Sequence, residues 1–83
     1  MDKKRFLLEI TYKQGRFTFV VELFCDSLSL ACIYALYHYE KHPEDKFKII
    51  DLVYDYVVFD NPDIRVIKRF LNENHKTNEI QNP

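Results

Sequence analysis

The chain has 83 residues, a net charge of −1, an apolar fraction of 47% and an aromatic fraction of 16%. This composition predicts one globular domain and excludes wholesale disorder and a generally basic nucleic-acid-binding protein. The charge is nevertheless uneven, with +3 on residues 1–16, −4 on residues 40–63 and +2 on residues 64–83. Such segregation suits head-to-tail self-association or one charged partner, and it is also compatible with ordinary solvated surface.

Two stretches near the N-terminus have the period-two pattern of half-buried β-strands. In residues 5–12 one face carries Phe6, Leu8, Ile10 and Tyr12, and in residues 16–24 one face carries Phe17, Phe19, Val21 and Leu23. Residues 13–16 join the two stretches, and Gly15 supplies the positive φ that a tight hairpin requires. We expect a hairpin with four apolar cross-strand pairs, which are Tyr12 with Phe17, Ile10 with Phe19, Leu8 with Val21, and Phe6 with Leu23.

Residues 26–42 are predicted to form a central helix of about four turns. Asp26 or Ser27 is a suitable N-cap, and Pro43 disfavours helical backbone at the residue before it. On a helical wheel Leu28, Cys32, Ala35, Leu36 and Tyr39 form one apolar arc, and Leu30, Ile33 and Tyr37 form a second. A helix with two apolar faces is usually covered by more than one neighbour, so we expect a sheet beneath it and a further element or a partner on its flank.

The pattern of residues 43–60 is compatible with either a helix or a strand. The sequence Pro43-Glu44-Asp45 is a good helix start, and polar residues recur at positions 44, 48, 51 and 55. The density of Ile, Val, Tyr and Phe between residues 49 and 59 favours a strand, which would also cover the open edge beside the first strand. We favour one strand over about residues 47–58, with a bulge near Ile49-Ile50. A right-handed crossover then gives the sheet order 2-1-3.

A second helix is predicted from Asn61 as N-cap and Pro62 at the first helical position. Apolar residues recur at helical spacing through Asn74, at positions 64, 67, 70 and 71. The polar end of the chain, residues 76–83, is predicted to be a flexible tail. The expected fold is therefore a single compact α+β domain over residues 1–75 with the order ββαβα. The alternative order is ββααα, if residues 44–58 are helical.

No set of residues predicts catalysis, a metal or a cofactor. His38 and His42 are spaced to share a metal ion, but the zinc-protease helix needs Glu directly after the first His, where this chain has Tyr39. Asp51 and Asp55 would lie ~13 Å apart on a strand, too far for paired-carboxylate hydrolysis. On a helix they would be ~6 Å apart, and even there a solvated acidic face is the commoner outcome. We expect the protein not to be an enzyme.

The two cysteines and the N-terminus indicate the compartment. Cys25 and Cys32 form no CxxC motif, and we expect them to be buried free thiols in a reducing environment. The basic residues at positions 3–5 precede an apolar run that Glu9 interrupts, so no signal peptide is predicted. The central helix is too short for a membrane span, which needs ~20 apolar residues. We therefore expect a cytoplasmic protein without membrane contact.

Tyrosines give the best indication of function. Tyrosine is favoured at interfaces because it joins a large apolar body to a polar tip at low entropy cost. We predict a partner-binding surface made of Leu30, Tyr34, Tyr37, His38 and Lys41 on the central helix, together with Asp51 and Asp55 in the acidic segment. Tyr54 and Tyr56 would share one face of the third strand. The alternative is that the tyrosines belong to the core, with their hydroxyls reaching water.

The sequence therefore predicts a small non-enzymatic module that binds a protein partner or a second copy of itself. The abundance of residues with AT-rich codons is typical of small proteins from phages and mobile elements of AT-rich bacteria, where such a module would inhibit a host protein by occluding it. The alternative function is nucleic-acid binding with steep salt dependence, through Lys3, Lys4, Arg5, Arg16, Arg65, Lys68 and Arg69. Acidic residues near the tyrosines argue against a base-stacking surface there.

Overall fold

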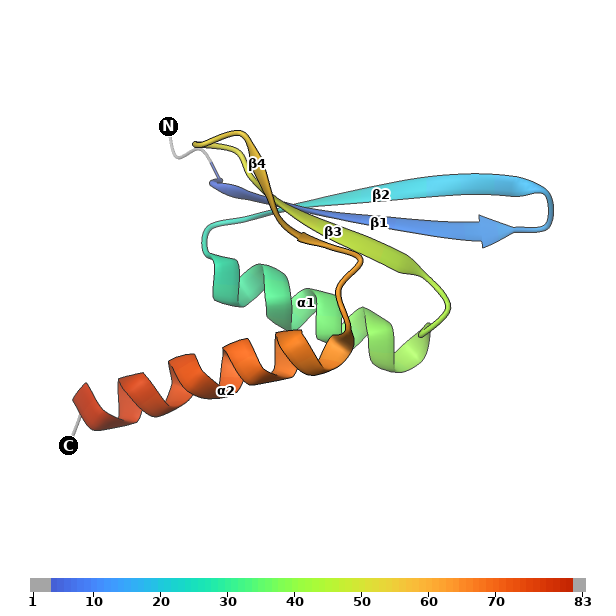
Figure 1. Cartoon of the computed structure of the whole chain (residues 1–83). Helices are drawn as coiled ribbons and strands as arrows, with labels where there is room; N and C mark the ends of the chain where they lie inside the picture. The colour runs from blue at the N-terminus through green and yellow to red at the C-terminus, as the bar shows by residue number, and fades with distance from the viewer. Residues whose placement is uncertain (1–3, 82–83) are drawn as a thin grey trace.

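The computed structural model describes the backbone of residues 4–81 and the side chains of residues 4–74. The elements, in chain order, are β1 (Phe6–Gln14), β2 (Phe17–Cys25), α1 (Leu28–Lys41), β3 (Lys46–Asp51), β4 (Tyr56–Asp60) and α2 (Ile64–Gln81). The strands form one antiparallel sheet in the order β2-β1-β3-β4. Both helices lie on the same side of the sheet, and the β1–β2 hairpin reaches past them (Figure 1). The predicted α+β class, the hairpin and the adjacency of strands 2, 1 and 3 are confirmed.

The hairpin loop has two residues, Gly15 and Arg16. Gly15 has φ +65° as predicted, and a positive φ at the first loop position is the requirement of a type II′ turn. The strands pair as Gln14 with Phe17, Tyr12 with Phe19, Ile10 with Val21, Leu8 with Leu23 and Phe6 with Cys25. The predicted register is therefore wrong by two residues, because Lys13 and Gln14 belong to β1 and not to the loop. A shift of two keeps every side chain on its predicted face.

The central helix has the predicted boundaries. Ser27 is its N-cap, with Oγ accepting a hydrogen bond from the Leu30 N–H at 3.1 Å. At the other end the His42 N–H donates to the His38 carbonyl at 2.8 Å, immediately before Pro43. Small side chains fill the buried face of α1, which consists of Ala31, Cys32 and Ala35. Their size lets the helix lie close to the sheet.

The core lies between the helices and the central strands. Leu8 of β1 and Ile49 of β3 are directly paired and fully buried, and Ile67 of α2 is also fully buried. Burying each of these side chains contributes ~1.5–3 kcal/mol. The other core members are Phe6, Ile10, Cys25, Ala31, Cys32, Ala35 and Phe47. Both cysteines are free and buried, as predicted.

Residues 43–60 form two strands where one was predicted. The chain turns at residues 52–55, and Asp55 has φ +53°. The Asp51 carboxylate makes this turn, since its Oδ1 accepts from the Val53 N–H at 3.0 Å and the Tyr54 N–H at 3.3 Å. The predicted irregularity near Ile49-Ile50 is present, with the extra residue on β4. The single long strand and the helical alternative are both wrong, and Tyr54 lies in the turn and not on a strand face beside Tyr56.

The second helix starts later and ends later than predicted. Its N-cap is Asp63, whose Oδ1 accepts from the Arg65 N–H at 2.9 Å. Asn61 is not the cap, because it has φ +48° and its N–H donates to the Phe47 carbonyl at 2.7 Å. The helix passes the predicted end at Asn74 and continues to residue 81, since the sequence has no Gly or Pro from 64 to 81. The predicted tail, residues 76–83, overlaps this helix, and residues 82–83 lie outside the described residues.

Candidate binding surface

The fold leaves much apolar surface uncovered. Among the described residues, fifteen large apolar or aromatic side chains are at least 39% exposed. They include six on β2, three on α1 and five from the β3–β4 turn into β4. Single exposed apolar residues are normal in soluble proteins, but contiguous exposed sets usually mark contact surfaces.

The predicted residues of α1 form an outer stripe, defined here as Leu30, Tyr34, Tyr37 and Lys41. Tyr37 is 64% exposed and Tyr34 is 44% exposed, so neither belongs to the core. The Lys41 Nζ lies 5.0 Å from the centroid of the Tyr37 ring, a cation–π distance. Leu30 is partly buried against the core and anchors the stripe. The outer stripe is continuous with Ile33, which is also exposed.

The contact that His38 makes is with Asp45 and not with the outer stripe. Its Nε2 is 2.7 Å from Oδ2 of Asp45, which comes just before β3. The Asp45 side chain is only 10% exposed. The His38–Asp45 contact therefore ties the end of α1 to the start of β3, and it fixes the orientation of the helix on the sheet.

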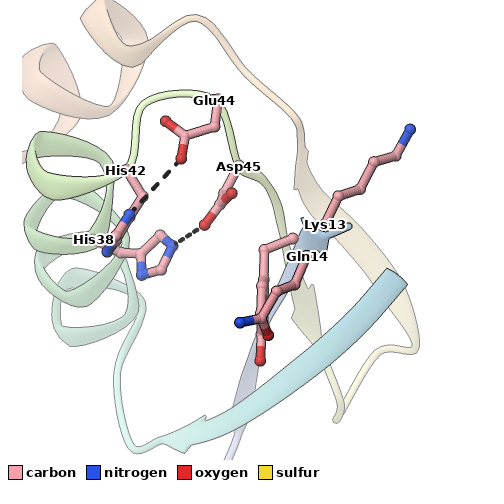
Figure 2. A pocket seen from close by; sticks show the side chains of 7 residues that line it. Lys13, Gln14, His38, His42, Glu44 and Asp45 are labelled. Atoms are coloured by element: carbon pink, nitrogen blue, oxygen red, sulfur yellow. Dashed lines mark hydrogen bonds and ion pairs between the residues drawn. The ribbon is translucent and has the colours of Figure 1, made fainter. Parts of the chain in front are cut away.

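The same end of α1 borders a cavity of about 350 Å³, lined by Tyr12, Lys13, Gln14, His38, His42, Glu44 and Asp45. Figure 2 shows His38 and His42 facing Asp45 and Glu44, while the Lys13 side chain extends away from the histidines. The His42 Nδ1 is 3.7 Å from a Glu44 carboxylate oxygen, and donor atoms of His42, Glu44 and Asp45 all lie within 4.8 Å of one another. Imidazole and carboxylate groups suit Zn²⁺, so these residues could hold a cation. Each carboxylate, however, already contacts a histidine, Asp45 with His38 and Glu44 with His42. The signal that the sequence offered was the acidic pair Glu44-Asp45, which follows His42 after Pro43.

Asp51 and Asp55 are not brought together. Asp51 is buried, and its carboxylate binds the Arg5 guanidinium through two hydrogen bonds of 2.9 and 3.3 Å. This guanidinium, together with the two turn amides, holds the pKa of Asp51 below its ordinary value despite burial. Asp55 is exposed in the turn. Asp51 thus serves the fold, and Asp55 is the one of the two that is open to a partner.

Several of the basic residues predicted as nucleic-acid contacts are engaged within the protein. Lys4 pairs with Asp26 at 3.0 Å, Arg5 with Asp51, and Arg65 with Asp63 at 2.8 Å. The other predicted contacts with described side chains are Arg16, Lys68 and Arg69, all of them exposed. Lys3 lies outside the described residues.

A second uncovered surface, on β2, was missed by the sequence reasoning. Its apolar side chains are exposed on both faces of the strand, and they are Phe17, Phe19, Val20, Val21, Leu23 and Phe24. Phe19 stacks on Tyr12 of β1 with ring centroids 5.3 Å apart, and Phe17 lies 6.4 Å from Phe19. The alternating pattern predicts that one of these faces is buried, whereas α1 covers only part of the hairpin (Figure 1).

Comparisons with known proteins add no assignment. No family model matches the chain, and no curated protein or solved structure is significantly similar to it. Within residues 4–81, neither helix combines the length and the apolar character that crossing a membrane would need. The functional argument therefore depends on the surfaces described above.

Proposed function

We propose that this protein is a non-enzymatic module that binds a protein partner through the outer stripe of α1. The observation that carries the proposal is the exposure of Tyr34 and Tyr37 side by side with Ile33 on one helix. Tyrosine is enriched among the residues that dominate binding energy, and its ring loses little conformational entropy on binding. Lys41 adds a positive charge over the Tyr37 ring, which favours a partner with an acidic or polar rim.

The helix that carries the outer stripe is held rigidly. Ser27 caps its first turn, the small residues Ala31 and Ala35 seat it on the sheet, and the His38–Asp45 contact ties its last turn to β3. A preorganised surface pays less entropy on association than a mobile one. The rigid mounting of the tyrosines therefore supports a role in recognition.

The reactive groups of the chain support a non-enzymatic role. Burial raises the pKa of the Cys32 thiol to about 12, and it also raises the pKa of Cys25. A thiol that stays protonated is a poor nucleophile. Two buried free thiols also suit a reducing compartment, so a cytoplasmic location belongs to the proposal. The phage or mobile-element origin, and inhibition by occluding a host protein, stay predictions from composition and size.

The nucleic-acid alternative has less support. Three of its predicted contacts, Lys4, Arg5 and Arg65, already bind carboxylates within the protein. The predicted contacts that stay exposed are Arg16 in the hairpin loop and Lys68 and Arg69 on α2, and among the described residues α2 packs against α1 and not against the hairpin. A phosphate-binding surface needs clustered, free cations, so we do not propose this function.

The test is affinity capture with three versions of the protein, followed by binding measurements on the purified pair. Wild type and the control Val66→Ala, which truncates an exposed apolar residue on α2, should enrich the same protein and bind it equally. The variant Tyr34→Ala/Tyr37→Ala should lose ~2 kcal/mol or more of binding free energy. Equal binding by all three versions, or capture of no protein that binds in purified form, would contradict the proposal.

A further inference from the structure

The outer edge of β2 offers unpaired backbone groups. β2 is an outermost strand and pairs with β1 over all nine of its residues without a bulge. In a hairpin closed by a two-residue loop, Phe17 and every second residue after it bond to the neighbouring strand. The N–H and C=O groups of Thr18, Val20 and Glu22 therefore point away from the sheet. Proteins normally protect such an edge with proline, lysine, a bulge or a short strand, and β2 has none of these.

The charges of this segment are self-complementary. Arg16 precedes Phe19 by three residues, and Glu22 follows it by three. Two β2 strands paired antiparallel about a two-fold axis through Phe19 would bring Arg16, in the loop just before each strand, next to Glu22 of the other copy. The dimer would contain two such Arg16–Glu22 ion pairs, because the two-fold axis repeats each contact. A partner of a different sequence would need its own acidic and basic residues at the same spacing to match this pattern.

Glu22 makes no ion pair with any residue that the structure describes. Its directly opposite residue on β1 is Glu9, and like charges at opposite positions destabilise a strand pair. In the part of the chain that the structure describes, no ion pair involves Arg16 or Glu22. Glu9 already has Lys48 of β3 directly opposite on its other side, whereas Glu22 would gain an opposite charge only from a cation supplied on the outer side of β2.

The apolar side chains fit the same register. On the helix side of the sheet Phe19 would lie opposite Phe19 of the other copy, and Phe17 opposite Val21. These are pairs without mutual hydrogen bonds, in which opposing side chains approach closest. The antiparallel arrangement also sets the loop end of each hairpin, Gly15 and Arg16, beside Glu22 and Leu23 of the other copy. The exposed Phe17 and Phe19 rings would thereby gain an apolar neighbour.

We propose that two copies of the chain associate through β2, antiparallel and centred on Phe19, so that their sheets join into one continuous sheet. The occupant of the β2 edge is a second copy because the strand's own charges and apolar residues match each other about Phe19. This contact uses a surface separate from the outer stripe of α1. The homodimer and the partner-binding function can therefore fail independently.

The experiment is charge exchange between Arg16, in the hairpin loop, and Glu22, on β2, read by light scattering and sedimentation equilibrium. The wild type should be dimeric, and Arg16→Glu and Glu22→Arg should each weaken the dimer at least about tenfold, because like charges then meet. The double variant Arg16→Glu/Glu22→Arg should restore the dimer. An equimolar mixture of the two single variants should form heterodimers, which no effect on folding would produce.

The control is Lys68→Glu on α2, which changes net charge as Arg16→Glu does and should leave the dimer intact. Circular dichroism should show the same fold for every variant, since both exchanged residues are exposed. A wild type that stays monomeric up to about 100 μM would overturn the proposal. So would a dimer that is indifferent to both single exchanges, or a double variant as weak as the single ones.

Discussion

At the scale of single residues, Asp51 shows why some assignments fail from sequence. Its position in an acidic segment suggested a solvated face, yet it is buried and bound to Arg5, 46 residues away in the chain. No local pattern reports a contact of that sequence separation. The same carboxylate accepts from the amides of Val53 and Tyr54, so one side chain both closes the turn and neutralises a guanidinium.

The variant Asp51→Asn tests the charge of this contact. Asparagine can still accept from the turn amides but cannot pair with Arg5 as an anion, so we expect a lower free energy of unfolding at neutral pH. The folded-state pKa of Asp51 is depressed, so its contribution is complete above the ordinary aspartate pKa and is lost as pH falls through the lower folded value. Urea unfolding at several pH values should show the wild type and the variant converging in acid. A constant difference down to the most acidic pH would show that the charge is not responsible.

At the scale of elements, the presence and type of the elements with strong local patterns were predictable. Alternation identified β1 and β2, and the cap at Ser27 with Pro43 bounded α1. The register was not predictable, because pairings shifted by two residues place the same side chains on the same faces. The turn between β3 and β4 was hidden as well, since residues 52–55 include no Gly, Pro or Asn. That turn depends on the Asp51 side chain and on the positive φ of Asp55.

The hairpin loop allows a matched test of the observed turn. Gly15 has φ +65° and no heavy atom within 4 Å of a built Cβ, so Gly15→Ala meets only backbone strain. We expect it to lower the free energy of unfolding by ~1 kcal/mol. Arg16→Ala, at the neighbouring loop position without a positive φ, should be nearly neutral in the same urea titration of protein dilute enough to be monomeric. If the two variants behaved alike, the assigned loop would be wrong.

At the scale of the whole molecule, the two uncovered surfaces differ in how far the sequence revealed them. The outer stripe of α1 was predictable because a helical wheel separates a second apolar arc from the first. The β2 surface was not predictable from alternation, which marks a face as apolar but not as covered. The difference in length between the helix and the strands could have indicated that part of the hairpin is uncovered. A 14-residue helix spans ~21 Å and a nine-residue strand ~30 Å, so the helix leaves part of the hairpin bare.

The free energy of unfolding of variants distinguishes residues of a contact surface from residues of the core. Because Tyr34 and Tyr37 are exposed, Tyr34→Ala/Tyr37→Ala should change the free energy of unfolding by less than ~1 kcal/mol. Leu8→Ala removes a fully buried side chain and should cost ~2–5 kcal/mol. Both values come from urea unfolding curves with unchanged slopes. A tyrosine variant as unstable as Leu8→Ala would place the outer stripe in the core and remove the basis for the proposed function.

The central claim is that apolar surface left bare by this fold is contact surface, and amide hydrogen exchange along β2 tests it most directly. In dilute protein the amides of Phe19 and Val21, bonded to β1, should be protected, while those of Thr18, Val20 and Glu22 should exchange freely. At high protein concentration the second set should become protected as well. Free exchange of Thr18, Val20 and Glu22 at every concentration would contradict the claim for β2.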